Sequence, residues 1–331
     1  MKILLLLSLI IIVGCTAPLS TATVTQDTVI PKLIPSATQV SINSPTPTST
    51  TTAAPTSITT EPNLPSETPT AEAIVTLLPT QVDKGPSDGP IYADHNIVDQ
   101  FDQIPDTAIE AAANLRLLFR HASVGENIKF GLSCIWGNFP DRRPSACGDF
   151  FEHKYDPSKW VFEARGNPGW VRKIDDFIQQ TNQRSDDFDV VGFAIDYVDG
   201  LDTERSPISS IENFNERYIK RLEALEAAHP DKIFVWWTMS LARIGQKNTQ
   251  DFNSMVRSYA ISNHKILFDI ADIESHDPKG NPSLNEDGYE VIYDGYTDEK
   301  VSGHLNKLGQ ERVARAFWWL MARISGWDGV K

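Results

Sequence analysis

Ser123 and His304 are the side chains whose types and surroundings could support nucleophilic chemistry. Ser123 lies in Phe119-Arg-His-Ala-Ser-Val-Gly-Glu126, where an apolar run ends and a helical pattern begins. A serine hydroxyl is scarcely ionised at neutral pH, so it attacks a carbonyl carbon only when a base removes its proton. His304, in a polar segment just before the last helical pattern, is the candidate base. If the fold brings the two side chains together, they predict acyl-transfer chemistry.

Each of these residues also has a purely structural interpretation. Ser123 and Glu126 have the spacing of a capping box, in which Ser123 accepts from the backbone N–H of Glu126 and the Glu126 carboxylate reaches back. His304 could be an ordinary surface or packing residue of its loop. The two interpretations differ in whether the hydroxyl and the imidazole meet in space.

Five apolar runs alternate with helical patterns and would have to position these residues. The runs cover residues 115–119, 160–164, 189–195, 232–238 and 265–270, and the helical patterns cover 123–132, 170–180, 211–228, 249–262 and 307–324. The runs are apolar on both faces, which is typical of parallel strands covered by helices on both sides. We expect an α/β fold, a three-layer α/β/α sandwich with a five-stranded parallel sheet of flavodoxin-like type. Asn306 is expected to cap the last helix.

Ligands of such sheets bind at the carboxyl ends of the strands, where the sequence places Ser123. Together these features resemble the SGNH, or GDSL, hydrolase superfamily over about residues 112–325, most clearly in Gly303-His-Leu-Asn-x-x-Gly309 and the apolar helix after it. The resemblance implies an SGNH hydrolase-like domain with Ser123 as nucleophile and His304 as base. It also implies an ester substrate, for which we expect an O-acyl group on a carbohydrate, and no cofactor.

The sequence departs from the superfamily pattern at two positions. His121 and Ala122 precede the serine where the family usually has Gly-Asp, and Val301 stands three residues before His304, where the family has the aspartate that orients the histidine. We expect Asp298, one turn earlier, to take that role. The alternatives are a dyad without an acid and an inactive site, since loss of this carboxylate in serine proteases lowers turnover by about 10⁴.

An oxyanion needs hydrogen-bond donors aimed at it. In the superfamily these come from the serine amide, a glycine after the second strand and an asparagine after the third. The resemblance assigns the second position to Gly166, with Asn167 as a side-chain donor, although the same segment could be a Gly-Pro turn that starts a helix. The third strand is followed by Asp196 and Asp199 and by no asparagine. These carboxylates could hold a substrate hydroxyl or a neighbouring loop.

Metal and phosphate motifs are weak in this sequence. Asp269, Asp272, His276 and Asp277 could suggest a divalent-cation site, but acidic residues commonly end a strand and begin a loop, so we predict no metal site. Glycine-rich phosphate loops and His-Glu-x-x-His helices are absent from the sequence.

The first residues form an expected export and anchoring signal. An apolar run covers residues 3–13 and is followed by Gly14 and Cys15. Eleven helical residues rise only about 16 Å, too little for a hydrocarbon core of about 30 Å, so the run is expected to be a signal peptide. Ile12-Val-Gly-Cys15 resembles a bacterial lipobox, which implies lipid attachment at Cys15. We therefore expect a bacterial extracytoplasmic protein, lipid-anchored to the cell membrane.

The rest of the chain is expected to be a tether and one domain. Residues 16–90 are rich in Ser, Thr and Pro, which favours an extended and disordered segment. Residues 91–331 are expected to form the domain. Cys134 and Cys147 remain after Cys15 is lipidated, and outside the cytoplasm an even pair favours a disulfide over two free thiols.

Composition excludes one class of partner and leaves three classes of function. With 30 Lys+Arg against 44 Asp+Glu, the net charge is -14, which argues against nucleic acid as a partner. A membrane-anchored esterase is the leading hypothesis. The alternatives are a non-catalytic glycan-binding surface module on the same fold and a solute-binding receptor, although receptors usually have two lobes.

Overall fold

The computed structural model of the protein describes residues 90–135, 156–201 and 205–329. The predicted signal peptide with Cys15, the tether up to residue 89, and Cys147 lie outside the described residues, as does the side chain of Cys134. The lipid anchor and the disulfide therefore stay predictions.

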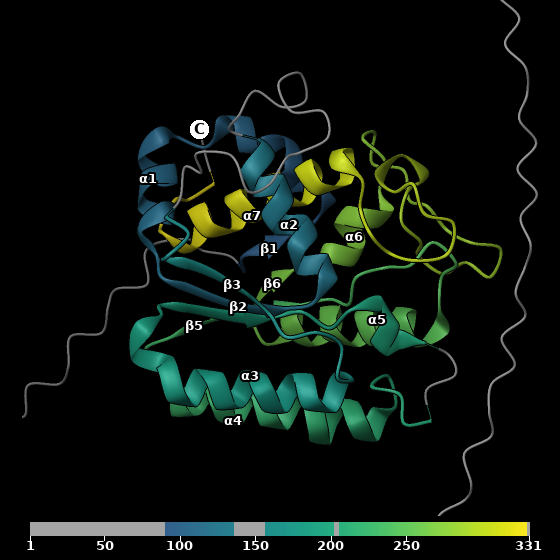
Figure 1. Ribbon diagram of the computed structural model, residues 1–331, viewed down its shortest axis with the longest axis horizontal. Coiled ribbons are helices and arrows are strands. Elements are labelled where there is room, and N and C mark those ends of the chain that lie inside the picture. Colours follow the sequence, from purple (N-terminus) through teal and green to yellow (C-terminus); the bar gives the residue numbers. More distant parts are fainter. Residues whose placement is uncertain (1–89, 136–155, 202–204, 330–331) are drawn as a thin grey trace, which may run out of the picture. The chain divides into compact units, whose positions relative to one another are not determined.

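A parallel sheet forms the centre of the described domain (Figure 1). Its strands, within the described ranges, are β1 (Tyr92–Ala93), β2 (Leu117–His121), β3 (Trp160–Ala164), β4 (Val190–Phe193), β5 (Ile233–Trp237) and β6 (Ile266–Phe268). They are ordered β1-β6-β5-β4-β2-β3, and every pair is parallel. The expected parallel sheet is confirmed, with six strands in place of five. The additional strand, β1, is two residues long and pairs with β6 at one edge.

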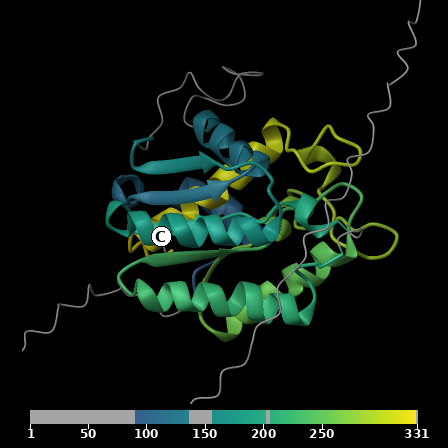
Figure 2. The same ribbon diagram turned by 60° about the horizontal axis from the view of Figure 1, so that its bottom comes forward.

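Helices cover both faces of the sheet, as the apolar runs predict (Figures 1 and 2). One face is covered by α1 (Asp106–Asn114), α2 (Ser123–Cys134) and α7 (Lys307–Ile324), and the other by α3 (Trp170–Arg184), α4 (Lys220–Ala228) and α5 (Lys247–Ser262). Strand β2 shows why: Leu117 and Phe119 point into the first helical layer, while Leu118 points into the second. The three-layer α/β/α sandwich is thus confirmed.

Shorter helical segments connect these elements. They are η1 (His95–Gln103), η2 (Ser185–Asp187), η3 (Tyr197–Gly200), η4 (Asn213–Ile219), α6 (Ile270–Ser275) and η5 (Asp294–Tyr296). The helix expected over residues 211–228 divides into η4, which is a π-helix, and α4. Helix α7 begins and ends where the sequence predicts, and the Asn306 side chain accepts hydrogen bonds from the amides of Leu308 and Gly309.

The tryptophan pairs of β5 and α7 belong to the core. Trp236, Trp237, Trp318 and Trp319 are all buried, so they offer no exposed face to a sugar. Burial of such rings is a large source of stability for the sandwich. Of the helices described, none is both long enough and apolar enough to cross a bilayer.

Candidate functional site

Ser123 begins helix α2 at the carboxyl end of β2, and its hydroxyl is free. Ala122 is the N-cap residue, with extended backbone angles (φ -116°, ψ -147°) and no side-chain cap. The capping box between Ser123 and Glu126 is therefore not formed, and the Glu126 carboxylate faces Lys129 with 3.6 Å between Oε2 and Nζ. No group among the described residues forms a hydrogen bond with the Ser123 side chain. The hydroxyl is thus available at a helix N-terminus, where the backbone dipoles favour negative charge.

The first turn of α2 rests directly on His121, the last residue of β2. The His121 side chain is fully buried, and its Nδ1 lies 2.6 Å from the carbonyl oxygen of Ala122. Burial lowers the pKa of His121, which keeps the imidazole neutral. A Cβ added at Gly125 would lie 2.2 Å from Cγ of His121, so only glycine fits there. His121 is thus a packing histidine that fixes the start of α2.

The carboxylate that holds His304 belongs to Glu299. Its Oε1 lies 2.8 Å from Nδ1 of the His304 ring, and its Oε2 accepts a 2.9 Å hydrogen bond from the His304 backbone amide. With Nδ1 turned toward a carboxylate, Nε2 is the nitrogen left to accept a proton, as a general base requires. The contact with Nδ1 favours one tautomer, and together the two hydrogen bonds to one carboxylate fix the orientation of the ring.

The assignment of Asp298 as the acid is corrected by this geometry. Asp298 is exposed, and its Oδ1 lies 3.4 Å from Nδ2 of Asn306, away from the His304 ring. The loop from Thr297 to His304 folds back on itself because the Thr297 hydroxyl donates to the carbonyl of His304 (2.6 Å) and accepts from the amide of Glu299 (3.1 Å). This closure brings the carboxylate five positions before the histidine into contact with it.

The pair of Glu299 and His304 favours an ionised carboxylate. Partial burial by itself would raise the pKa of Glu299, but the hydrogen bonds from the His304 backbone and ring outweigh it and lower the pKa below its usual value. The edge of the Tyr197 ring faces the imidazole, with 6.1 Å between centroids and an interplanar angle of 86°. The imidazole is held on one side by the carboxylate and flanked on another by an aromatic ring.

The loop of His304 packs over the same edge of the sheet at which Ser123 lies. A Cβ added at Gly303 would lie 2.3 Å from the carbonyl oxygen of Leu241, after β5, and 2.4 Å from the Tyr197 ring, after β4. Strand β4 pairs with β2, which carries Ser123 at its end. The helices that follow the two residues are also in contact, since a Cβ at Gly131 of α2 would meet the carbonyl of Gln310 in α7.

The Ser123 hydroxyl and the His304 ring do not form a hydrogen bond in this structure, in which both side chains are described. In proteins without substrate such bonds are often long and tighten only when substrate binds. The fold therefore places both residues over the same edge of the sheet. A hydrogen bond between the Ser123 hydroxyl and the His304 ring would require the two side chains to rotate.

Gly166 and Asn167 lie beside Ser123 in an open loop after β3. The Arg165 amide donates to the carbonyl of His121 (2.8 Å), which ties this loop to the end of β2. Gly166 has φ +69°, a conformation that favours glycine, and a Cβ there would meet nothing within 4 Å. Within the described part of the chain, neither the Gly166 amide nor the Asn167 side chain forms a hydrogen bond. Both donors are free to face a ligand, and their part in stabilising an oxyanion stays a prediction.

A buried ion cluster occupies the third donor position. Nζ of Lys173 lies 2.7 Å from Oδ2 of Asp196 and also contacts the carboxylate of Asp199. All three side chains are buried, and desolvation raises the pKa of Asp199 despite the attraction of Lys173. These aspartates hold helix α3 to the end of β4. Inside the protein their partner is therefore Lys173.

Arg165 brings a second positive charge toward this cluster. Burial lowers its pKa, whereas the charges of Asp196 and Asp199 raise it. Its guanidinium donates to the carbonyls of Ala194 and Gly166. Two basic side chains and two carboxyl groups therefore lie together at the end of β4, where no asparagine stands.

A polar cavity of about 430 Å³ lies next to the segment that carries His304. It is lined by Arg243, Pro282, Ser283, Leu284, Asn285, Val291, Tyr293 and Asp294. The Arg243 amide donates to the carbonyl of Ser302 (2.9 Å), two residues before His304. Hydroxyl, amide and charged groups beside an aromatic ring suit a ligand rich in hydroxyl groups.

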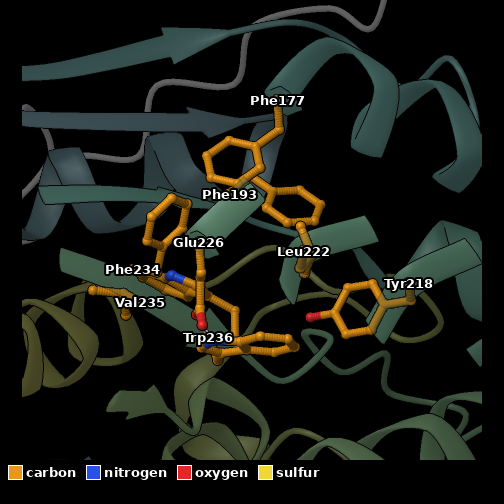
Figure 3. A pocket seen from close by; sticks show the side chains of 9 residues that line it. Phe177, Phe193, Tyr218, Leu222, Glu226, Phe234, Val235 and Trp236 are labelled. Atoms are coloured by element: carbon orange, nitrogen blue, oxygen red, sulfur yellow. Dashed lines mark hydrogen bonds between the residues drawn. The ribbon is translucent and has the colours of Figure 1, made fainter. Parts of the chain in front are cut away.

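A second hollow, shown in Figure 3, is a packing gap. It lies between the sheet and helices α3 and α4, where Phe177, Phe193, Leu222, Phe234 and Trp236 surround it. Its volume is only about 10 Å³, which is at most enough for a single water molecule. This hollow is too small for a substrate.

Lys173 and His95 each join a polar cluster and were not singled out from the sequence. Lys173 stands among Trp170, Ile174 and Phe177 on the buried side of α3, and a lysine within an apolar stripe is a signal for a buried ion pair. His95 joins Asp272 and His276 in a cluster whose residues are partly buried. The lysine could have been noticed in the sequence, whereas no local pattern links His95 to Asp272.

Comparisons with known proteins found likenesses in structure. No protein-family model matches the sequence, and no curated protein matches it. An acetyl xylan esterase of known structure has 18% identity, covers 62% of this chain and 98% of its own, and has a TM-score of 0.39. A lipolytic protein described as of the G-D-S-L family from Desulfitobacterium hafniense has 12% identity, with coverage of 62% and 99% and a TM-score of 0.38.

An acylhydrolase from Bacteroides fragilis has 12% identity, covers 69% of this chain and 95% of its own, and has a TM-score of 0.42. At such values these likenesses assign no activity to the protein.

Proposed function

We propose that the domain is an SGNH-type serine esterase in which Ser123 is the nucleophile, His304 the general base and Glu299 the residue that positions the histidine. The observation that carries the proposal is the double hydrogen bond from His304 to Glu299. A carboxylate that accepts hydrogen bonds from both the ring and the backbone amide of a histidine orients the ring, as a general base requires. The second observation is the free hydroxyl of Ser123 at the start of α2, over the same edge of the sheet.

The proposed reaction has two steps, acylation of Ser123 and then hydrolysis of the acyl-enzyme. Oγ of Ser123 attacks the ester carbonyl carbon, its proton passes to Nε2 of His304, and the carbonyl electron pair moves to the oxygen. The tetrahedral intermediate then expels the alcohol, which takes the proton from the imidazolium and leaves an acyl group on Ser123. In the second step water gives a proton to His304 and attacks the acyl carbon. The bond to Oγ of Ser123 then breaks, Ser123 recovers the proton, and the carboxylic acid is released. Glu299 stabilises the imidazolium in both steps.

The developing oxyanion requires hydrogen-bond donors aimed at the oxygen that takes the charge. The amide of Ser123, at the start of a helix, and the free donors of Gly166 and Asn167 lie around that position in this proposal. Losing one such donor typically raises the barrier by about 3 kcal/mol. The contact of Asp196 with Lys173 reduces the repulsion that an isolated carboxylate would cause.

An O-acyl group on a carbohydrate is the substrate class that we propose. The polar cavity beside the segment of His304 supports it, because its hydroxyl, amide and charged groups can hydrogen-bond sugar hydroxyls. The acetyl xylan esterases among the similar structures suggest acetylated xylo-oligosaccharide as the assay substrate. A lipid anchor at Cys15 would hold the enzyme at the bacterial surface, where polymeric glycans are encountered.

A fluorophosphonate probe, which reacts only with an activated serine, tests the proposal. The wild type is expected to gain one adduct by intact mass, and peptide mapping is expected to place it on Ser123. Ser123→Ala and His304→Ala should abolish labelling. Ser254→Ala is the matched control, because the Ser254 hydroxyl only donates to the carbonyl of Gln250 within α5.

A glycan-binding module without catalysis is the second candidate function. It is favoured by the absence of a hydrogen bond between Ser123 and His304 and by a carboxylate, Asp196, where a neutral donor is expected. Folded wild type that takes no label yet binds xylo-oligosaccharide in calorimetry would establish this function and reject the esterase.

A further inference from the structure

Two histidines and an aspartate meet near the β1 edge of the sheet, away from β2 and Ser123. His95 begins η1 just after β1, while Asp272 and His276 come from α6 and the residue after it, following β6. Since β1 and β6 are paired, the carboxyl ends of these strands bring together residues 177 positions apart. Three strands, β6, β5 and β4, separate β1 from β2, so the cluster is separate from the candidate esterase site.

Both imidazoles turn the same nitrogen toward one carboxylate. Nδ1 of His95 lies 2.5 Å from Oδ1 of Asp272, and Nδ1 of His276 lies 3.4 Å from Oδ2. The two rings are stacked, with 3.8 Å between centroids and an interplanar angle of 6°. Both Nδ1 atoms therefore lie on the same side of the stacked pair of rings, next to one carboxylate.

The spacing of the donors is close to that of a metal centre. Ligand atoms at about 2.1 Å from a tetrahedral ion are about 3.4 Å apart. The separation between His276 and Oδ2 already has this value, and the separation from His95 to Oδ1 would have to open by less than about 1 Å. Without a metal, Nδ1 of His276 also faces the backbone carbonyl of Asp272 at 2.9 Å.

Surrounding contacts hold the carboxylate in place. Oδ1 of Asp272 accepts the backbone amide of His95 (2.8 Å), and the Asp272 amide donates to Asp269 (3.1 Å). Outer contacts of this kind orient the ligands of metal sites. The side chains of His95, Asp272 and His276 are 18%, 18% and 13% exposed, so a small ion and a water molecule can reach them.

The charges around the cluster attract a cation. Beside the cluster, the guanidinium of Arg257 pairs with two carboxylates, those of Asp269 and Glu290. Asp272 adds a third carboxylate through its amide hydrogen bond to Asp269, so the acidic groups here outnumber the one guanidinium.

We propose that His95, Asp272 and His276 bind a divalent transition-metal ion of the Zn²⁺ type, with the fourth position open to water. Two imidazoles and a carboxylate are the ligands that such ions prefer, whereas Mg²⁺ and Ca²⁺ prefer sites made of oxygen atoms alone. The ion would join η1 to α6 and so fasten the N-terminal part of the domain to its C-terminal half.

Zn²⁺ titration of the purified full chain, prepared without a polyhistidine tag and stripped with chelator, tests the proposal. Calorimetry is expected to show one site per chain. His95→Ala and His276→Ala should each weaken the affinity at least about 10-fold, and Zn²⁺ should raise Tm of the wild type and leave that of the double variant unchanged. Co²⁺ should give the visible absorption of a tetrahedral centre in the wild type alone.

His264→Asn is the control, because His264 is exposed, lies outside the cluster and has a φ of 52° that asparagine tolerates. Asp272→Asn, which keeps the size of the side chain, replaces either alanine variant that fails to fold by circular dichroism. Folded wild type that binds no Zn²⁺ would overturn the proposal, and so would binding that the cluster variants leave unchanged. Neither result bears on labelling of Ser123.

Discussion

Replacing Glu299 by glutamine changes one atom of the proposed triad and tests its least expected member. In the native loop one carboxylate oxygen accepts the His304 backbone amide at 2.9 Å and the other faces the ring Nδ1 at 2.8 Å. Glutamine has one oxygen, which can keep the backbone bond and the loop. Its NH₂ group then faces Nδ1 and forces that nitrogen to act as acceptor, which leaves the proton on Nε2.

An imidazole in that tautomer cannot accept the proton of Ser123, so the expected loss is large. The same tautomer error in serine proteases lowers turnover by about 10⁴, which corresponds to about 5 kcal/mol of barrier. Because the glutamine side chain retains the backbone hydrogen bond, we expect the variant to stay folded at the assay temperature. The predicted result for Glu299→Gln is a fall in kcat of about 10³ to 10⁴ with KM nearly unchanged.

Release of acetate from acetylated xylo-oligosaccharide, or of nitrophenol from an activated acetate ester, measures this effect. Asp298→Asn is the matched control, since Asp298 is exposed and contacts only Asn306 at 3.4 Å. The control is expected to stay within about twofold of the wild type, as for surface substitutions away from a site. Near-normal turnover in Glu299→Gln, with loss in Asp298→Asn, would refute the assignment.

Three further predictions concern stability. Lys173→Met should cost about 3 to 5 kcal/mol in urea unfolding because it leaves two buried carboxylates unpaired, whereas Lys220→Met, which removes an exposed pair, should cost less than about 1 kcal/mol; equal losses would contradict the buried cluster. Gly125→Ala should cost about 1 to 3 kcal/mol through the clash with the His121 ring, and His121→Ala should restore part of it; additive losses would show that the two residues do not meet. The lowered pKa of Glu299 means that its ionised form stabilises the fold above the pKa of the unfolded chain, so the stability difference between wild type and Glu299→Gln should vanish as the pH falls through the lowered pKa; a difference that grows toward acid would reverse the sign.

The apolar runs predicted the sheet well because parallel strands are buried on both faces and need apolar residues at every position. Strand β3 has the bounds that the sequence indicates, and helix α7 matches at both ends. Strand β1 escaped prediction because two residues carry no periodicity. Helix α1 was missed because its alanine-rich sequence shows little apolar stripe.

Site residues could be predicted where their position follows from the end of one strand or the start of one helix. Ser123 lies after β2 and His304 before α7, and both places follow from local patterns. Glu299 was missed because the turn made by the Thr297 hydroxyl, and not a fixed spacing, brings it to the histidine. The meeting of His95 with Asp272 depends on the pairing of β1 with β6, which no local pattern encodes.

The central claim is that Ser123 and His304 act as one unit, and a double-mutant cycle on kcat tests it most directly. Residues that share one proton transfer are strongly non-additive, because the second substitution removes what the first has already disabled. We predict that Ser123→Ala, His304→Ala and the double variant all have the same residual kcat, within about threefold. Losses that multiply in the double variant would show that the hydroxyl and the imidazole act independently, and would contradict the proposed mechanism.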